Sequence, residues 1–116
     1  MENNLREGKG IKFYNNGGRY EGEFKNGLRE GKGKEYYING DRYEGEYKNG
    51  KKEGKGIYYY NDGARYDGDW KNNLREGNGI FYFINGDKEI GRYMNGNKIG
   101  NHITMKANGE IILNHY

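Results

Sequence analysis

Glycine recurs at a fixed interval of 23 residues along this chain, and the interval constrains the fold more than any other feature. The glycines form two series: Gly8, Gly31, Gly54, Gly77, Gly100 and Gly17, Gly40, Gly63, Gly86, Gly109. Asparagine and aromatic residues keep the same spacing: Asn3, Asn26, Asn49, Asn72, Asn95 and Phe24, Tyr47, Trp70, Tyr93, Tyr116. Such a period predicts a repeat protein, in which each unit buries its apolar face against its neighbours.

Each unit is predicted to be a β-hairpin. Residues 43–47 alternate between aromatic and polar types, and residues 56–60 are aromatic and β-branched, so both segments have the character of strands. A polar turn is expected between them, over residues 49–54, because it contains Asn-Gly and a second glycine. Nothing in the chain repeats with helical spacing. The predicted fold is all-β: an elongated, single-layer antiparallel meander of stacked 23-residue hairpins.

Strand pairing across this turn predicts two unlike faces. On one face, aromatic rings lie over glycines and stack between units. The residues expected to form this packed face are Tyr20, Phe24, Tyr43, Tyr47, Tyr66, Trp70, Gly33, Gly56 and Gly79. The other face combines a column of carboxylates with a column of Ile and Tyr. A shift of one residue in the pairing would exchange the two faces.

The motif Y-E-G-E-aromatic-K-N-G-x-x-E-G-K-G begins at Tyr20 and Tyr43 and is closely matched from Tyr66. It resembles the MORN (membrane occupation and recognition nexus) repeat. On this resemblance the chain is one MORN domain, residues 1–116. Its predicted units are a partial first repeat at 1–19, clear repeats at 20–42, 43–65 and 66–88, and a degenerate repeat or cap at 89–116.

The resemblance implies a binding array without catalysis. MORN proteins serve as scaffolds in the cytoskeleton, in cilia and in parasite division structures, and some hold a partner helix in a groove. Some dimerise at the C-terminal end, lipid binding has been proposed, and some arrays adjoin a catalytic domain. The chain is therefore expected to be cytoplasmic, with cytoskeleton, cilium or membrane as candidate sites of association.

The residue types needed for catalysis are sparse. The chain has no Cys or Ser, and its two histidines, His102 and His115, lie thirteen residues apart in the degenerate unit, so neither a nucleophile–base pair nor a metal site is predicted. No cofactor is expected. Carboxylates recur identically in every unit, whereas a glycosidase needs two in different environments. Residues 27–32 lack the Ser or Thr and the helix of a phosphate-binding loop.

Charge and hydropathy exclude few partners. The formal net charge of +3 is too small to indicate nucleic acid. No apolar run is long enough to span a membrane, and the polar start predicts no signal peptide. A basic edge for anionic lipid is an alternative. It would comprise the loop cations Arg6, Arg29, Lys52, Arg75, Lys98 and the lysines Lys9, Lys32, Lys55.

The main functional hypothesis is a non-enzymatic scaffold that binds a peptide or an amphipathic helix on the carboxylate face. The residues predicted to contact the partner are Tyr36, Ile57, Tyr59, Ile80, Tyr82, Glu23, Glu44, Glu46, Asp67 and Asp69. Self-association as a homodimer through the C-terminal end is predicted at Ile111, Ile112 and Leu113. The alternatives are a peripheral membrane tether and a regulatory array for an enzyme in another chain.

Overall fold

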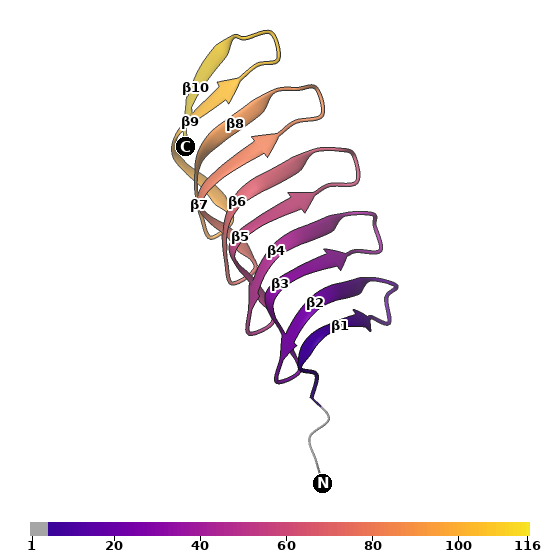
Figure 1. Cartoon of the computed structure of the whole chain (residues 1–116). Helices are drawn as coiled ribbons and strands as arrows, with labels where there is room; N and C mark the ends of the chain where they lie inside the picture. The colour runs from indigo at the N-terminus through magenta and orange to yellow at the C-terminus, as the bar shows by residue number, and fades with distance from the viewer. Residues whose placement is uncertain (1–4) are drawn as a thin grey trace.

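The computed structural model describes residues 5–116 as one antiparallel sheet of ten strands that pair in chain order (Figure 1). The sheet is elongated, with extents of 62 × 25 × 19 Å. The strands are β1 (Gly8–Phe13), β2 (Arg19–Lys25), β3 (Leu28–Tyr36), β4 (Arg42–Lys48), β5 (Lys51–Tyr59), β6 (Arg65–Lys71), β7 (Leu74–Tyr82), β8 (Lys88–Met94), β9 (Asn97–Met105) and β10 (Ile111–His115). This confirms the all-β meander; Asn3, the first asparagine of its series, lies outside the described residues.

The hairpin turn is shorter than the sequence predicted. Asn49 (φ 51°) and Gly50 (φ 84°) both have left-handed backbone, which is the requirement of the two-residue Asn-Gly turn. Strand β5 begins immediately at Lys51, so the prediction of a turn extending to Gly54 was wrong. The strand continues because the register shifts between Gly45 and Tyr47, and Gly54 accommodates the shift with a positive φ of 70°.

The predicted assignment of the faces is correct. Tyr43 pairs with Tyr58 and Gly45 with Gly56, and Tyr20, Tyr43 and Tyr66 are fully buried. A Cβ atom on Gly56 would lie 2.1 Å from the Tyr43 hydroxyl oxygen. The ring can therefore lie over the backbone only because glycine stands opposite it. We call this side of the sheet the aromatic face.

Edge-to-face contacts connect the rings of neighbouring units along the aromatic face. The ring centroids are 5.1 Å apart for Tyr20–Tyr47, 5.3 Å for Tyr43–Trp70 and 5.2 Å for Tyr66–Tyr93. This geometry is favourable for aromatic pairs. A single layer of sheet thus acquires a continuous core, which is the nearest-neighbour stacking expected of a repeat protein.

Polar contacts also connect successive units at the Asn-Gly turns. The carboxylate of Glu30 accepts the Asn49 amide at 3.1 Å, and Glu53 accepts the Asn72 amide at 2.9 Å. The loop cations lie on the aromatic face, where the guanidinium of Arg29 is 5.0 Å from the centre of the Tyr47 ring. Lys52 is one of these loop cations, and its burial lowers its pKa. Each loop therefore contributes to packing between units.

Candidate partner-binding site

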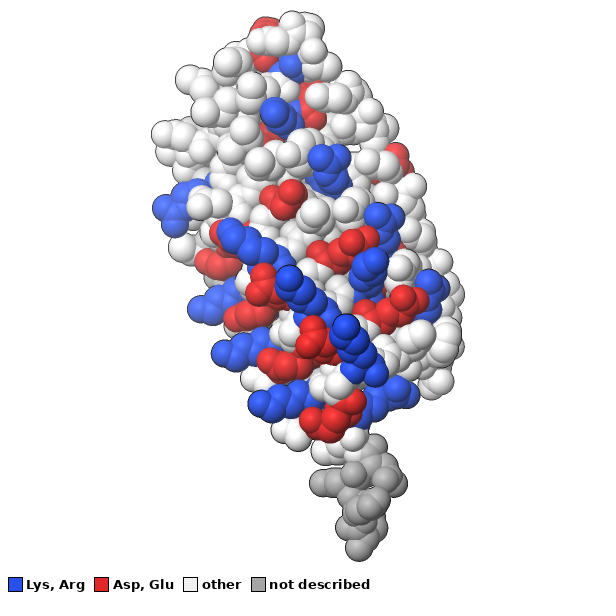
Figure 2. Space-filling model, in the orientation of Figure 1, with Lys and Arg blue, Asp and Glu red and all other residues white. Residues whose placement is uncertain are grey.

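The side of the sheet opposite the rings, which we call the charged face, carries parallel rows of residues that run across the strands. The isoleucine row consists of Ile11, Glu21, Lys34, Glu44, Ile57, Asp67, Ile80, Ile90, Ile103 and Leu113. The tyrosine row consists of Phe13, Arg19, Tyr36, Arg42, Tyr59, Arg65, Tyr82, Lys88, Met105 and Ile111. The lysine row consists of Lys9, Glu23, Lys32, Glu46, Lys55 and Asp69. Figure 2 shows that charged side chains gather over the N-terminal strands and thin out toward β10.

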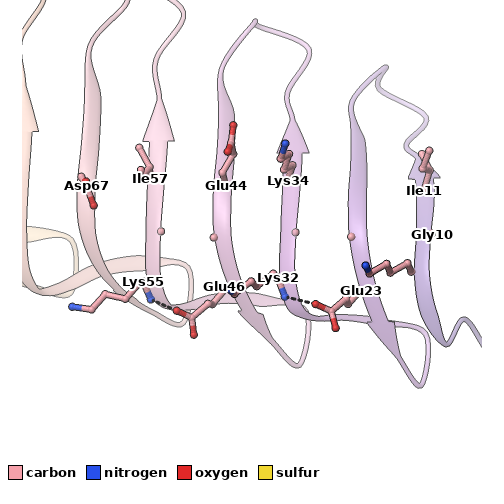
Figure 3. Close-up of a pocket in the computed structure, with 15 residues that line it drawn as sticks. Gly10, Ile11, Glu23, Lys32, Lys34, Glu44, Glu46, Lys55, Ile57 and Asp67 are labelled. Atoms are coloured by element: carbon pink, nitrogen blue, oxygen red, sulfur yellow. Dashed lines mark hydrogen bonds between the residues drawn. The ribbon is translucent and has the colours of Figure 1, made fainter.

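A trough of about 950 Å³ lies between the lysine row and the isoleucine row, over strands β1 to β6 (Figure 3). Its floor is a row of glycines, one from each of strands β1 to β5: Gly10, Gly22, Gly33, Gly45 and Gly56. These glycines have no side chain on either face, and the face behind them holds the tyrosine rings. The trough therefore presents bare backbone that a partner segment can approach closely.

The carboxylates of the lysine row are used by the protein's own backbone. Glu23 accepts the Lys32 amide at 3.1 Å and Glu46 accepts the Lys55 amide at 3.2 Å, as Figure 3 shows. Asp69 makes the same contact with the Asn78 amide and pairs with the ammonium group of Lys55. Each of these acids accepts a hydrogen bond from the backbone of the facing strand at the register shift of its hairpin, so the recurrence of the acids has a structural cause.

The predicted tyrosine anchors lie beneath arginines. The guanidinium carbon of Arg19 is 3.9 Å from the Tyr36 ring centre, that of Arg42 is 3.8 Å from Tyr59, and that of Arg65 is 3.7 Å from Tyr82. Arg42 also pairs with Glu44 at 2.9 Å, and Arg19 with Glu21 at 2.7 Å. The hydrogen bond to the carboxylate raises the pKa of Arg42. A partner on this row would meet flat cation–ring stacks rather than bare rings.

All ten predicted contact residues lie on the charged face, but the structure divides them. Only five line the trough: Glu23, Glu44, Glu46, Ile57 and Asp67. Four lysines share it with four of these acids: Lys9, Lys32, Lys34 and Lys55. The trough is therefore electrically balanced, which differs from the negative flank expected from the carboxylates alone.

Sequence reasoning missed the arginines of the tyrosine row and the continuous glycine floor. Both features are visible in the sequence as 23-residue periods. Arg19, Arg42 and Arg65 each precede a buried tyrosine, and the glycines of the floor recur at the same interval. The two sets of cations proposed as one basic edge are on opposite faces. Lys9, Lys32 and Lys55 line the trough, whereas the loop cations cover the aromatic rings.

Within residues 5–116 no helix has the length and apolar character needed to cross a membrane. No group of three or more His, Cys, Asp or Glu side chains in the same range is arranged to hold a metal ion.

Comparison with known proteins gives one result at the level of the repeat. The family model described as "MORN repeat" matches residues 1–19, 20–42, 43–65 and 66–88. A search of curated proteins finds none that matches the chain.

Proposed function

Because this chain belongs to the MORN-repeat family, whose arrays are general binding modules and typically non-catalytic, we propose that it is a scaffold that holds a segment of a protein partner in the trough. The observation that supports this most directly is the glycine floor between two walls of side chains. Grooves of this kind accept an extended or helical segment through backbone proximity and spaced side-chain contacts.

The two walls favour different parts of an amphipathic helix. On the lysine row the acids contact the backbone, and Lys55 is already paired with Asp69, which leaves the exposed ammonium groups of Lys9 and Lys32 to meet acidic residues. On the isoleucine row, Ile57 is apolar and Asp67 is suited to a basic residue, whereas Glu44 is paired with Arg42 and stands beside Lys34. A helix with an apolar face, one acidic flank and one basic flank complements both walls.

The pitch of the array matches such a helix. Equivalent residues recur at every second strand, roughly 9.5 Å apart, because neighbouring strands are spaced about 4.7–4.9 Å. Seven residues of an α-helix rise about 10.5 Å. A helix lying along the trough would therefore present residues seven apart to successive units, and the predicted recurrence in the partner is heptad-like.

A synthetic peptide tests the proposal directly. The probe is an amphipathic helical peptide with Glu along one flank and Lys along the other, and its control has the same composition with charges scrambled. Binding is followed by NMR through the backbone amides of Gly22, Gly33, Gly45 and Gly56, which should shift with the probe and not with the control. Ile57→Asp should abolish the shifts, while Ile38→Asp, at a turn residue that is 72 % exposed, should not. Shifts confined to the aromatic face would refute the trough as the site.

The membrane-tether alternative has less support, because the loop cations are engaged with aromatic rings. It remains testable with vesicles of phosphatidylserine and phosphatidylcholine at increasing salt. Electrostatic lipid binding should collapse as ionic strength rises, whereas an apolar trough contact should persist. The cytoplasmic, cytoskeletal or ciliary setting stays a prediction.

A further inference from the structure

The two outer strands of the sheet expose edges that are complementary in their place within the repeat. Strand β10 occupies the position in the 23-residue unit that β2 occupies, and β1 occupies the position of β3. Inside the array, β2 and β3 pair with each other. Within residues 5–116, the unpaired edge of β10 is thus the edge that β2 offers to β3, and the unpaired edge of β1 is the edge that β3 offers to β2. At the β1 edge the Arg6 guanidinium donates to the Ile11 carbonyl at 2.9 Å, and a joining strand must displace this contact.

The β2–β3 register, transferred to β10 and to β1 of a second copy, brings apolar residues together. Arg19 pairs with Tyr36 in the chain, and the equivalent pair is Ile111 with Phe13 of the next copy. Glu21 pairs with Lys34, and the equivalent pair is Leu113 with Ile11 of the next copy. The four edge residues, Phe13, Ile11, Ile111 and Leu113, are 74 %, 49 %, 59 % and 74 % exposed.

We propose that this chain associates head to tail with further copies of itself, β10 of one copy pairing with β1 of the next and extending the sheet. The isoleucine row supports this geometry, because Ile80, Ile90, Ile103 and Leu113 would continue directly into Ile11 of the next copy. Burial of the matched apolar pairs and closure of two free strand edges favour the joint. The contact joins unlike surfaces, so it leaves a free edge at each end and adds copies in a line.

Besides the Arg6 contact at the β1 edge, Asn114 weakens the joint relative to a hairpin within the chain. Asn114 stands where β2 has Gly22, and a Cβ at Gly22 would lie 2.5 Å from the Cα atom of Gly33. The equivalent atom at the joint belongs to Gly10 of the next copy, so the two strands must lie further apart there. The association is therefore expected to be reversible and dependent on concentration.

Charge substitutions distinguish this joint from a two-fold dimer through β10 alone. In sedimentation velocity over a wide concentration range, Leu113→Glu and Ile11→Lys should each weaken association roughly tenfold or more, which corresponds to about 1.4 kcal/mol. The chain carrying both substitutions should recover association, because it recreates the Glu21–Lys34 pair. Infrared amide bands confirm that each variant remains folded.

The alternatives give different patterns. A two-fold β10 dimer would be insensitive to Ile11→Lys and would not recover in the double variant, and either result overturns the head-to-tail joint. A wild-type chain that stays monomeric at every concentration also overturns it. Asn114→Gly provides a test in the opposite sense, because removal of the Cβ should strengthen association, while Ile38→Glu, away from both edges, serves as the neutral control.

Discussion

The regular units and the last unit, residues 89–116, bury a ring at the same place on the aromatic face but supply it from different strands. In a regular unit the first strand supplies a tyrosine and the second a glycine, and Tyr43 donates to the Glu46 carbonyl at 3.1 Å. In the last unit Glu89 stands at the tyrosine position and His102 at the glycine position. The ring nitrogen Nε2 of His102 lies 2.9 Å from the Arg92 carbonyl, the counterpart of that of Glu46. The unit thus requires a buried ring and a contact with this carbonyl, and either strand can supply them.

The exchange leaves the last unit less well satisfied. Glu89 Oε2 lies 2.8 Å from His102 Nδ1, yet neither atom has a hydrogen-bond partner among the described residues. The Tyr93 hydroxyl is also buried without a partner, and Lys98 pairs with the other Glu89 oxygen at 3.0 Å. Buried polar atoms without partners are costly. The regular units should therefore be the more stable part of the array.

The largest expected effect is on the free energy of unfolding, when a ring of the aromatic column is removed at Trp70, inside the array, or at Tyr116, at its end. Trp70 is 8 % exposed, contacts Tyr43 and Tyr66 edge to face, and donates to the Gly56 carbonyl. Trp70→Ala should cost about 3–5 kcal/mol in the free energy of unfolding. Tyr116→Ala, at the half-exposed end of the same column, should cost about 1 kcal/mol or less. Chemical denaturation measures both, and equal losses would contradict the comparison.

The second prediction reverses the exchange of side chains. His102→Gly should cost about 2–4 kcal/mol, because it removes a buried ring and leaves the Glu89 carboxylate without that neighbour. Adding Glu89→Tyr should recover most of the loss, since it restores the arrangement of the regular units. A double-mutant cycle by thermal unfolding gives the coupling energy. Additive losses would show that the two positions do not replace each other.

The smallest expected effect is a pH dependence that distinguishes the two regions. Burial raises the pKa of Glu89, but the hydrogen bond from Lys98 and the nearby charges outweigh it, so the folded pKa lies below the ordinary 4.5. A carboxyl with a depressed folded pKa contributes stability above its unfolded pKa and loses it as pH falls through the folded value. Melting temperatures from neutral to acidic pH should therefore fall more steeply for wild type than for Glu89→Gln. Asp69→Asn, at a more exposed acid in a regular unit, should flatten the slope less.

The accuracy of the predictions follows from the range of the interactions involved. The glycine and aromatic columns predicted the faces correctly, because alternation along a strand decides which residues share a side. The predicted turn at Asn49–Gly54 was too long. The chain reverses at two left-handed residues, and the remaining polar residues belong to a strand whose register shifts opposite Glu46, although their composition suggested a loop. Five of the ten predicted contact residues lie outside the trough, since its extent depends on where neighbouring strands place their side chains.

The 23-residue period by itself determined the repeat class, the hairpin unit and the order of the strands, since a local pattern repeated without interruption can stack only on its neighbours. Only the tertiary structure decided which charges are available to a partner. Glu23 and Glu46 contact backbone amides, Arg42 covers Tyr59, and the loop cations cover the rings, and each of these contacts is made across strands or between units. Sequence spacing records that such residues recur, whereas the curvature and register of the sheet decide what each of them contacts.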